Sequence, residues 1–352
     1  MNYRKYLLYT IAIFICLVCT LTCLAVEKVE YKWKLACPWT REQVDQNLQL
    51  FCDLVNTYSD GRMEIELFTH GILGGHDEMF HAVQEGSLEM AQGAAYVHLV
   101  PGGMLFWMPW TVENYGQLAK AFEYPSGILY QIGNKAFEEV GLKFIYDIFD
   151  GPYGLANNVR PIKTPDDFKN LKFRVSGSLG YVRALENMGK GTGLTLHTIP
   201  YADVYNALDR GVIDGCWSLW PSLVDEKQHE VLKYVTALDW AWGVGAIVVN
   251  KEKWDSLPEE LQDAIIRAGK VARVESYENG IRLDAKFIKA LVDGETTEVY
   301  FPTSEERTLF REKSNMLAVW EELCEPWLEK TYPGENMTQK VIDELNRIIE
   351  EY

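Results

Sequence analysis

The stretch TPDDFKNLKFRVSGSLGYVRALENM, residues 164–188, contains three secondary-structure signals in succession. Thr164 is a favoured helix N-cap, Pro165 is favoured in the first turn, and two acidic residues follow them. Residues 171–175 then predict a strand, and residues 179–188 predict a helix. Helices and strands that alternate in this way are typical of an α/β domain with a largely parallel sheet.

The same alternation extends in both directions from this stretch. Upstream we expect strands at 31–37, 63–68, 88–92 and 144–149, and helices at 43–58, 77–85 and 117–140. Residues 101–109 are apolar but contain Gly and Pro, which predicts a loop, and Gly151-Pro152 is expected to end the fourth strand. Downstream we expect strands at 195–199 and 246–250, and helices at 202–210, 304–325 and 337–352.

A single long helix is expected to begin near Ser256, because no proline interrupts the chain between Pro258 and Pro302. Apolar and small residues recur at helical spacing, at Leu261, Ile265, Ala268, Ala272 and Ser276. Thirty helical residues span about 45 Å, which is longer than one small domain. We therefore expect this helix to lie across two domains.

The composition excludes several classes of protein. The chain has 352 residues, of which 47% are hydrophobic and 24% are charged, so it is neither disordered, collagenous nor a multi-span membrane protein. Its 51 acidic residues exceed its 34 basic residues, which gives a net charge of −17. A nucleic-acid-binding protein normally presents a basic face, so no nucleic-acid partner is expected.

The N-terminus has the pattern of a secretory signal peptide. Arg4 and Lys5 precede an uncharged, mostly apolar run that extends to Val26, with a small residue at Ala25. We expect residues 1–25 to be removed and the protein to reach the periplasm. Two alternatives stay open, because the run is nearly long enough for an anchor helix and Cys23 could carry a lipid.

Catalytic and metal-binding motifs are missing from the sequence. It has no nucleophile elbow, zinc-protease motif or phosphate-binding loop. His76 and His81 lie five residues apart, which does not place two metal ligands on one face of a helix. After loss of the signal segment four cysteines remain, Cys37, Cys52, Cys216 and Cys324. They lack zinc spacing and are expected to be free and buried, although their pairing stays open. We expect no enzyme activity, no metal and no cofactor.

Arg174 is the best candidate for binding an anion. It lies on the strand at 171–175, and Ser176-Gly177-Ser178 connects that strand to the next helix. Ligands of α/β proteins bind at the carboxyl ends of the strands. There a guanidinium and the backbone N–H groups at the start of the next helix can bind the same anion. A structural ion pair is the alternative for any single arginine.

Four motifs resemble those of the TRAP (tripartite ATP-independent periplasmic) transporter solute-binding proteins. The motifs are DDFKNLKFRV at 166–175, IPYADVYNALDRGVIDG at 199–215, SDGR at 59–62, and LGG followed by VQEGSLEM within 73–90. Their order and spacing are kept over roughly residues 31–275. Trp33, Trp39 and the residues at 93–96 are most similar to the branch that binds keto acids and other monocarboxylic acids.

The resemblance implies a two-lobed α/β clamp that closes on an organic acid and delivers it to membrane subunits. Lobe I would comprise 31–151 plus about 244–283, and lobe II 152–243 plus about 284–352. Arg174 matches the family arginine that grips the ligand carboxylate, and a guanidinium fork suits that group. The other ligand-binding residues that the resemblance suggests are Tyr201, Trp217, Ser218, Cys216, Trp39, Tyr96, Tyr153 and His76.

Departures from the family pattern limit what carries over. Cys216-Trp217-Ser218 stands where the keto-acid branch has a metal-binding Glu. No second arginine occupies a matched position, so we expect a monocarboxylate with an apolar or aromatic body rather than a dicarboxylate. The competing interpretations are a secreted α/β enzyme and a signal-anchored ligand-sensing domain.

Overall fold

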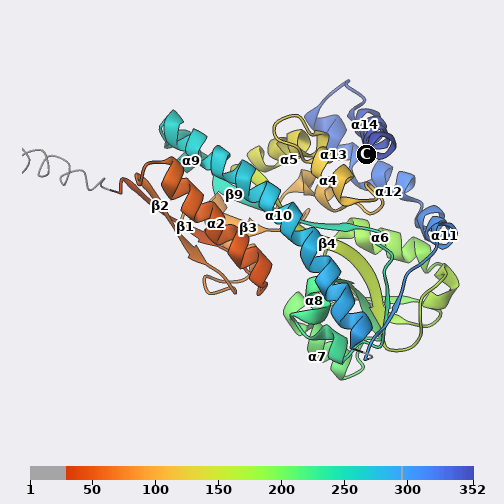
Figure 1. Ribbon diagram of the computed structural model, residues 1–352. Coiled ribbons are helices and arrows are strands. Elements are labelled where there is room, and N and C mark those ends of the chain that lie inside the picture. Colours follow the sequence, from red (N-terminus) through yellow and green to blue (C-terminus); the bar gives the residue numbers. More distant parts are fainter. Residues whose placement is uncertain (1–28, 295) are drawn as a thin grey trace, which may run out of the picture.

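The computed structural model describes residues 29–294 and 296–352 and contains two lobes joined by a central pair of strands (Figure 1). The expected signal segment lies outside the described residues. Helices cover the faces of a mixed sheet, with the strand order β2-β1-β3-β9-β4-β7-β5-β6. The predicted α/β class is therefore confirmed.

The first lobe is built from β1 (Tyr31–Ala36), β2 (Met63–Phe68) and β3 (Met90–Gly93), which run parallel. Helix α2 (Glu42–Tyr58) and helix α3 (His76–Gln84) connect these strands. The predicted apolar face of α2 is buried, including Val44, Leu48 and Phe51. Parallel strands place their carboxyl ends at one edge of the sheet, so the loops after β1 and β3 lie on the same side.

The second lobe repeats this arrangement with β5 (Lys172–Val175), β6 (Thr195–Thr198) and β7 (Gly215–Leu219), of which β5 pairs in parallel with both others. Its helices are α6 (Leu179–Met188), α7 (Val204–Asp209) and α8 (Trp220–Val224), with short 3₁₀ turns η2 (Pro165–Phe168), η3 (Tyr201–Asp203) and η4 (Gln228–Glu230). Two short parallel strands, β8 (Tyr234–Thr236) and β10 (Glu298–Tyr300), extend it beside β4.

Strands β4 (Leu142–Asn157) and β9 (Trp242–Asn250) connect the lobes as an antiparallel pair. The expectation that the strand ends at Gly151-Pro152 is wrong, because β4 continues through both residues. A register shift between Phe149 and Gly151 bends the strand there. Gly151 has a φ of 124°, which only glycine adopts without strain.

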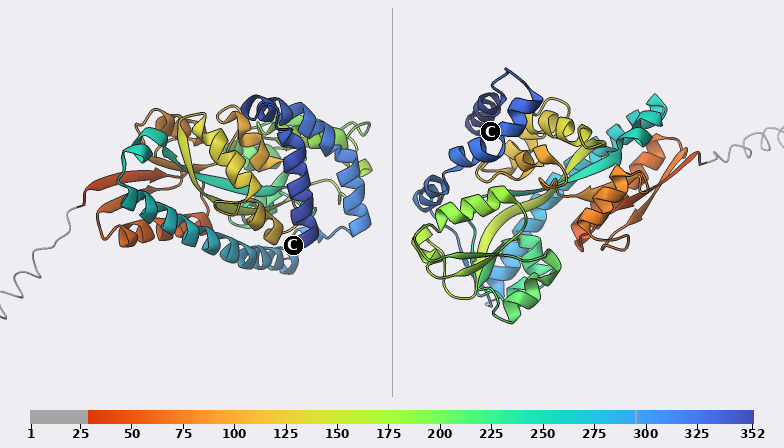
Figure 2. Two further views of the ribbon diagram at one scale, coloured as in Figure 1. Left: turned by 90° about the horizontal axis from the view of Figure 1, so that it is seen from above. Right: turned by 180° about the vertical axis from the view of Figure 1, so that it is seen from behind.

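The predicted long helix is α10 (Glu259–Asp293), which has 35 residues and follows the short α9 (Lys251–Ser256). It packs on α2 in the first lobe, on β4 between the lobes, and on α8 in the second lobe. Figure 2 shows it running along one side of the molecule. The expectation that one helix crosses both lobes is therefore confirmed.

Two expected elements need correction. The segment 101–109, expected as a loop, contains the 3₁₀ helix η1 (Pro101–Trp107). Its glycines permit close packing, because a Cβ on Gly103 would lie 2.2 Å from the Ala95 carbonyl oxygen. The helix expected at 117–140 is divided into α4 (Tyr115–Ala121) and α5 (Ile128–Glu138) by a turn that contains Pro125.

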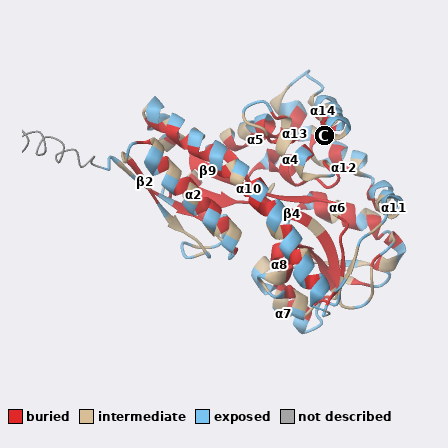
Figure 3. Cartoon of the chain, viewed as in Figure 1, coloured by how far each residue is buried: buried red, intermediate tan, exposed pale blue. Residues whose placement is uncertain are grey.

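The C-terminal segment forms α11 (Ser304–Ser314), α12 (Met316–Leu323), α13 (Glu325–Thr331) and α14 (Met337–Glu351). The first two contact α6, whereas α13 contacts η1 and α14 contacts α4 and α5. The proposed lobe boundaries stay a prediction. Buried residues follow the strands and the inner faces of the helices (Figure 3). Among the described residues, no helix is both long and apolar enough to cross a membrane.

Candidate ligand-binding site

A small cavity of about 50 Å³ lies between the two lobes, and a cleft of about 760 Å³ adjoins it. Five residues line both spaces, namely Trp39, Tyr96, Arg174, Ser176 and Tyr201. The other residues around the cavity are Arg41, Trp107, Asp150, Tyr153, Tyr181, Trp217, Ser218, Leu219 and Ser222. Both lobes and the connecting strand β4 therefore contribute to its walls.

Arg174 lies on β5, close to the carboxyl end of that strand, and only 5% of its surface is exposed. Its Nε donates a hydrogen bond to the carbonyl oxygen of Ile199 at 2.9 Å. The guanidinium carbon lies 5.7 Å from the ring centroids of both Tyr201 and Trp217. No carboxylate of the described residues forms an ion pair with it, so Arg174 is a buried cation without a protein counter-ion.

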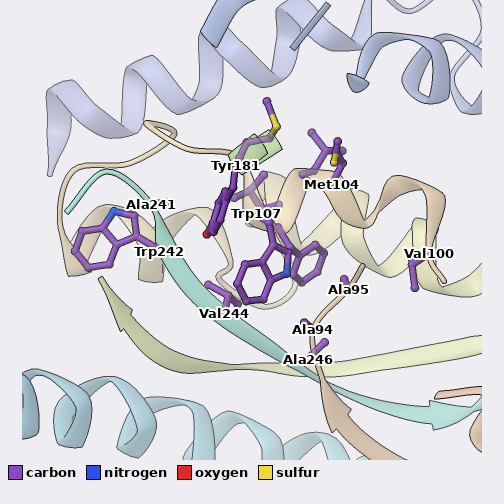
Figure 4. Close-up of a cluster of buried hydrophobic side chains, with 14 of the residues drawn as sticks. Ala94, Ala95, Val100, Met104, Trp107, Tyr181, Ala241, Trp242, Val244 and Ala246 are labelled. Atoms are coloured by element: carbon purple, nitrogen blue, oxygen red, sulfur yellow. The ribbon is translucent and has the colours of Figure 1, made fainter. Parts of the chain in front are cut away.

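Half of the residues that line the cavity are aromatic. They are Trp39, Tyr96, Trp107, Tyr153, Tyr181, Tyr201 and Trp217. Trp107 of η1 and Tyr181 of α6 lie side by side, with ring centroids 6.0 Å apart (Figure 4). Tyr181 also meets Trp217 edge to face at 5.0 Å. Such a wall offers a large, rigid contact area to the body of a small ligand.

Arg41 is a second guanidinium at the cavity, at a position that none of the family motifs covers. It occupies the N-cap position of α2, directly after the loop that follows β1, and is 5% exposed. Its Nη1 lies 3.2 Å from Asp150 Oδ1, and its Nε lies 3.6 Å from Glu226 Oε1. Unlike Arg174, it is therefore flanked by two carboxylates. Burial raises the pKa of Asp150, and the neighbouring Arg41 opposes that shift.

The residues predicted for the site separate into three groups. Seven of them line the cavity: Trp39, Tyr96, Tyr153, Arg174, Tyr201, Trp217 and Ser218. His76 lines only the adjoining cleft. Cys216 lies outside both linings, in the apolar core of the second lobe. Successive side chains of a strand point to opposite faces, so β7 directs Trp217 and Cys216 in opposite directions.

His76 and Asp77 form a polar cluster where the cleft begins. His76 Nδ1 lies 2.8 Å from Asp77 Oδ1, and His76 Nε2 lies 2.9 Å from the Ala94 nitrogen and 3.0 Å from the Ala94 carbonyl oxygen. His98 Nε2 lies 2.8 Å from the other Asp77 oxygen. The hydrogen bond from His76 holds the pKa of Asp77 well below its usual range.

The cysteines do not contribute a reactive thiol to the site. Cys37, Cys52, Cys216 and Cys324 are free and buried. Burial raises the pKa of Cys216 to about 12, so its thiol is protonated at neutral pH. Within the described part of the chain, no group of three or more His, Cys, Asp or Glu side chains is arranged to hold a metal ion.

Residues 40–325 match the family described as "DctP: Bacterial extracellular solute-binding protein, family 7". The chain belongs to this family. A curated relative, the C4-dicarboxylate-binding periplasmic protein DctP of Rhodobacter capsulatus, is 28% identical over 282 residues, 78% of either chain. The resemblance to TRAP solute-binding proteins is therefore confirmed at the level of the family.

Solved structures have the same fold as this family 7 solute-binding protein. A TRAP periplasmic solute-binding protein from Ochrobactrum anthropi aligns with a TM-score of 0.79 and 22% identity, covering 92% of this chain and 97% of its own. A second, from Sulfurospirillum deleyianum with bound succinate, has a TM-score of 0.73 and 22% identity, with coverages of 89% and 99%. The predicted two-lobed clamp is thus confirmed. These relatives do not distinguish the keto-acid branch from others.

Sequence reasoning missed Arg41, Asp150, Trp107 and Tyr181. Each comes from a segment outside the four family motifs, and only the fold brings them to the cavity. Arg41 had one usable signal, because it follows the first strand at the same sheet edge as the loop after β3. Trp107 had none, because its segment was expected to be a loop.

Proposed function

We propose that this protein is the extracytoplasmic receptor of a TRAP transporter and binds an organic monocarboxylate by lobe closure. The observation that carries the proposal is Arg174, a buried guanidinium at the cavity without a carboxylate partner among the described residues. An uncompensated buried charge is costly, and an anionic ligand removes that cost. A carboxylate is the anion that a guanidinium fork fits bidentately.

The charges around the cavity favour one anionic group on the ligand. Arg41 is offset by Asp150 and Glu226, whereas Arg174 has no carboxylate partner among the described residues. A second carboxylate beside Arg41 would also face those two acids. Succinate and C4-dicarboxylates are named for relatives of this chain, so the preference for a monocarboxylate is a proposal about this chain's own cavity.

Delivery to membrane subunits and residence in the periplasm are part of the same proposal. Their support is membership of an extracellular solute-binding family, the periplasmic designation of the relatives, and the signal-like N-terminus. The proposed role requires no catalysis. Binding that stabilises the protein against heat while leaving the ligand chemically unchanged is the expected behaviour.

Replacement of Arg174 by Ala tests the proposal by calorimetry against monocarboxylates that bind the wild-type protein. Loss of a desolvated charge partner costs about 3–5 kcal/mol, or at least a hundredfold in affinity. Arg174→Lys should recover part of this, because it keeps the charge but not the fork. Arg183→Ala is the control, since Arg183 is partly exposed and pairs with Glu186 and Glu322 outside the cavity. Near-normal affinity in Arg174→Ala refutes the assignment.

A further inference from the structure

Several polar atoms that line the cavity lack a hydrogen-bond partner among the described residues. They are Nε and Nη1 of Arg41, Oδ1 of Asp150, Nε1 of Trp107 and the hydroxyl of Tyr181. Buried polar groups in folded proteins are nearly always hydrogen-bonded, because an unmet donor or acceptor costs about 1–3 kcal/mol. Because all of these atoms belong to residues that line one cavity, a ligand bound there can supply the missing partners.

Arg41 and Asp150 form the centre of this unsatisfied group. Their nearest atoms, Nη1 and Oδ1, lie 3.2 Å apart, yet neither atom makes a hydrogen bond. Both side chains are more than nine-tenths buried. Arg41 is fixed at the N-cap of α2, and Asp150 precedes the bend at Gly151 in β4. The two side chains therefore place a donor and an acceptor next to each other without aligning them on one another.

The chemistry of this pair selects one kind of ligand group. A hydroxyl can accept from the guanidinium and donate to the carboxylate at the same time. A carbonyl only accepts, which would leave Asp150 Oδ1 unmet, and an ammonium only donates, which would leave Arg41 unmet. A second carboxylate could accept from Arg41 but would be repelled by Asp150 and Glu226.

We propose that Arg41 and Asp150 form a hydroxyl-binding subsite, so that the ligand is a hydroxy-monocarboxylate. Its carboxylate binds Arg174, its hydroxyl bridges Arg41 and Asp150, and the aromatic wall covers its carbon skeleton. This inference rests on the proposed function, because it assumes that Arg174 binds a carboxylate. Trp107 Nε1 and the Tyr181 hydroxyl are available to further oxygens on the same ligand.

Calorimetry with matched acids tests the subsite on the wild-type protein. The probes are lactate, 3-hydroxybutyrate, mandelate and gluconate, each compared with its deoxy partner propionate, butyrate, phenylacetate or hexanoate. Pyruvate and phenylglyoxylate serve as keto counterparts, and malate and succinate as dicarboxylates. At least one hydroxy acid should bind about tenfold or more tightly than both its deoxy and its keto partner, as expected for hydrogen bonds to charged groups.

Asp150→Asn provides a second readout that a purely structural role would not produce. The substitution keeps the shape but removes one negative charge beside Arg41. The preference for hydroxy over deoxy acids should shrink, and malate or succinate should gain affinity relative to monocarboxylates. Asp203→Asn is the matched control, because Asp203 is exposed and lines neither the cavity nor the cleft. Unchanged selectivity in folded Asp150→Asn contradicts the subsite.

The outcomes separate the two proposals. If hydroxy, deoxy and keto acids bind the wild-type protein equally and all require Arg174, the subsite is wrong and the receptor function stands. If dicarboxylates bind most tightly to the wild-type protein, the subsite is also wrong. If no acid of the panel binds, the carboxylate receptor itself is overturned and the subsite with it. The wild-type comparison decides even if Asp150→Asn does not fold.

Discussion

Trp39 of the first lobe and Tyr201 of the second lobe meet edge to face, with ring centroids 5.9 Å apart and ring planes at 82°. Trp39 follows β1, whereas Tyr201 begins η3, so this contact crosses from one lobe to the other. Both rings line the cavity and the adjoining cleft. A motion that opens the lobes would separate them and expose the space beside Arg174.

Ligand binding is therefore expected to change the intrinsic tryptophan fluorescence. Trp39 would gain or lose its contact with Tyr201, and Trp217 would change its surroundings beside Arg174. Trp39→Phe and Trp217→Phe should each reduce the fluorescence change, and the double variant should reduce it further, leaving the response of Trp107. Trp254→Phe is the control, because Trp254 is buried in the core of the first lobe away from the cavity. A full response in the double variant would contradict closure around these rings.

The ion pair between Arg41 and Glu226 gives a second contact between the lobes. Its atoms are 3.6 Å apart, and the Glu226 side chain is 20% exposed. Glu226 also accepts a hydrogen bond from the Tyr201 hydroxyl. Glu226→Gln should lower ligand affinity about twofold to fivefold, mostly through faster dissociation, because a partly exposed pair contributes about 0.2–1 kcal/mol.

Stopped-flow measurements of association and dissociation check this expectation. Glu230→Gln serves as the control, because Glu230 bonds the exposed Tyr205 hydroxyl and makes no ion pair with Arg41. A loss as large as that expected for Arg174→Ala would mean that Glu226 binds the ligand itself. No change in dissociation rate would mean that this ion pair does not stabilise the closed form.

Most of the fold follows from local signals in the sequence. The expected helix at residues 179–188 coincides with α6, and the long helix α10 was recognisable from the absence of proline over its length. The expectations fail where tertiary packing replaces a local rule. A Gly-Pro pair normally ends a strand, but at Gly151-Pro152 the pairing with the antiparallel strand β9 continues, so β4 continues as well.

The candidate site was only partly predictable for a related reason. Arg174, Tyr201 and Trp217 lie inside or beside motifs, so their positions carried information. Arg41 and Asp150 acquire their roles through one contact between segments more than a hundred residues apart. No local pattern encodes such a contact. Cys216 occupies a motif position but lies outside the cavity lining, because side chains alternate along β7 and Trp217 takes the face that lines the cavity.

Ligand binding is expected to be independent of metal ions. The motif position of the metal-binding Glu is filled by Cys216-Trp217-Ser218, which offers no carboxylate, and hard cations need several oxygen donors. Affinity measured after treatment with a chelator should therefore stay within about twofold of the untreated value, a difference of about 0.4 kcal/mol. Restoration of a lost affinity by Ca²⁺ or Na⁺ would reveal a cation site that these residues do not account for.

Asp284 of α10 should make the stability of the protein depend on pH. It is 2% exposed, accepts a hydrogen bond from the Tyr115 hydroxyl at 2.8 Å, and has no ion-pair partner among the described residues. Burial raises its pKa to about 7, the hydrogen bond from Tyr115 opposes the shift, and Asp239 adds to it. In the unfolded chain an aspartate has a pKa of about 3.9.

The sign of the effect follows from these two pKa values. Between about pH 4 and pH 7 the folded state binds a proton at Asp284 that the unfolded state has lost, so the stabilising contribution falls as the pH rises and is gone above pH 7. The difference of about three pKa units corresponds to at most about 4 kcal/mol.

Asp284→Asn keeps the bond to Tyr115 and removes the titration. Urea unfolding at pH 5 and pH 8 should show the variant gaining stability over wild type at both pH values, and clearly more at pH 8 than at pH 5. The control Asp293→Asn, at the exposed end of α10, should show no such difference between the two pH values. An equal effect of Asp284→Asn at both pH values would mean that Asp284 is already ionised in the folded protein at pH 5.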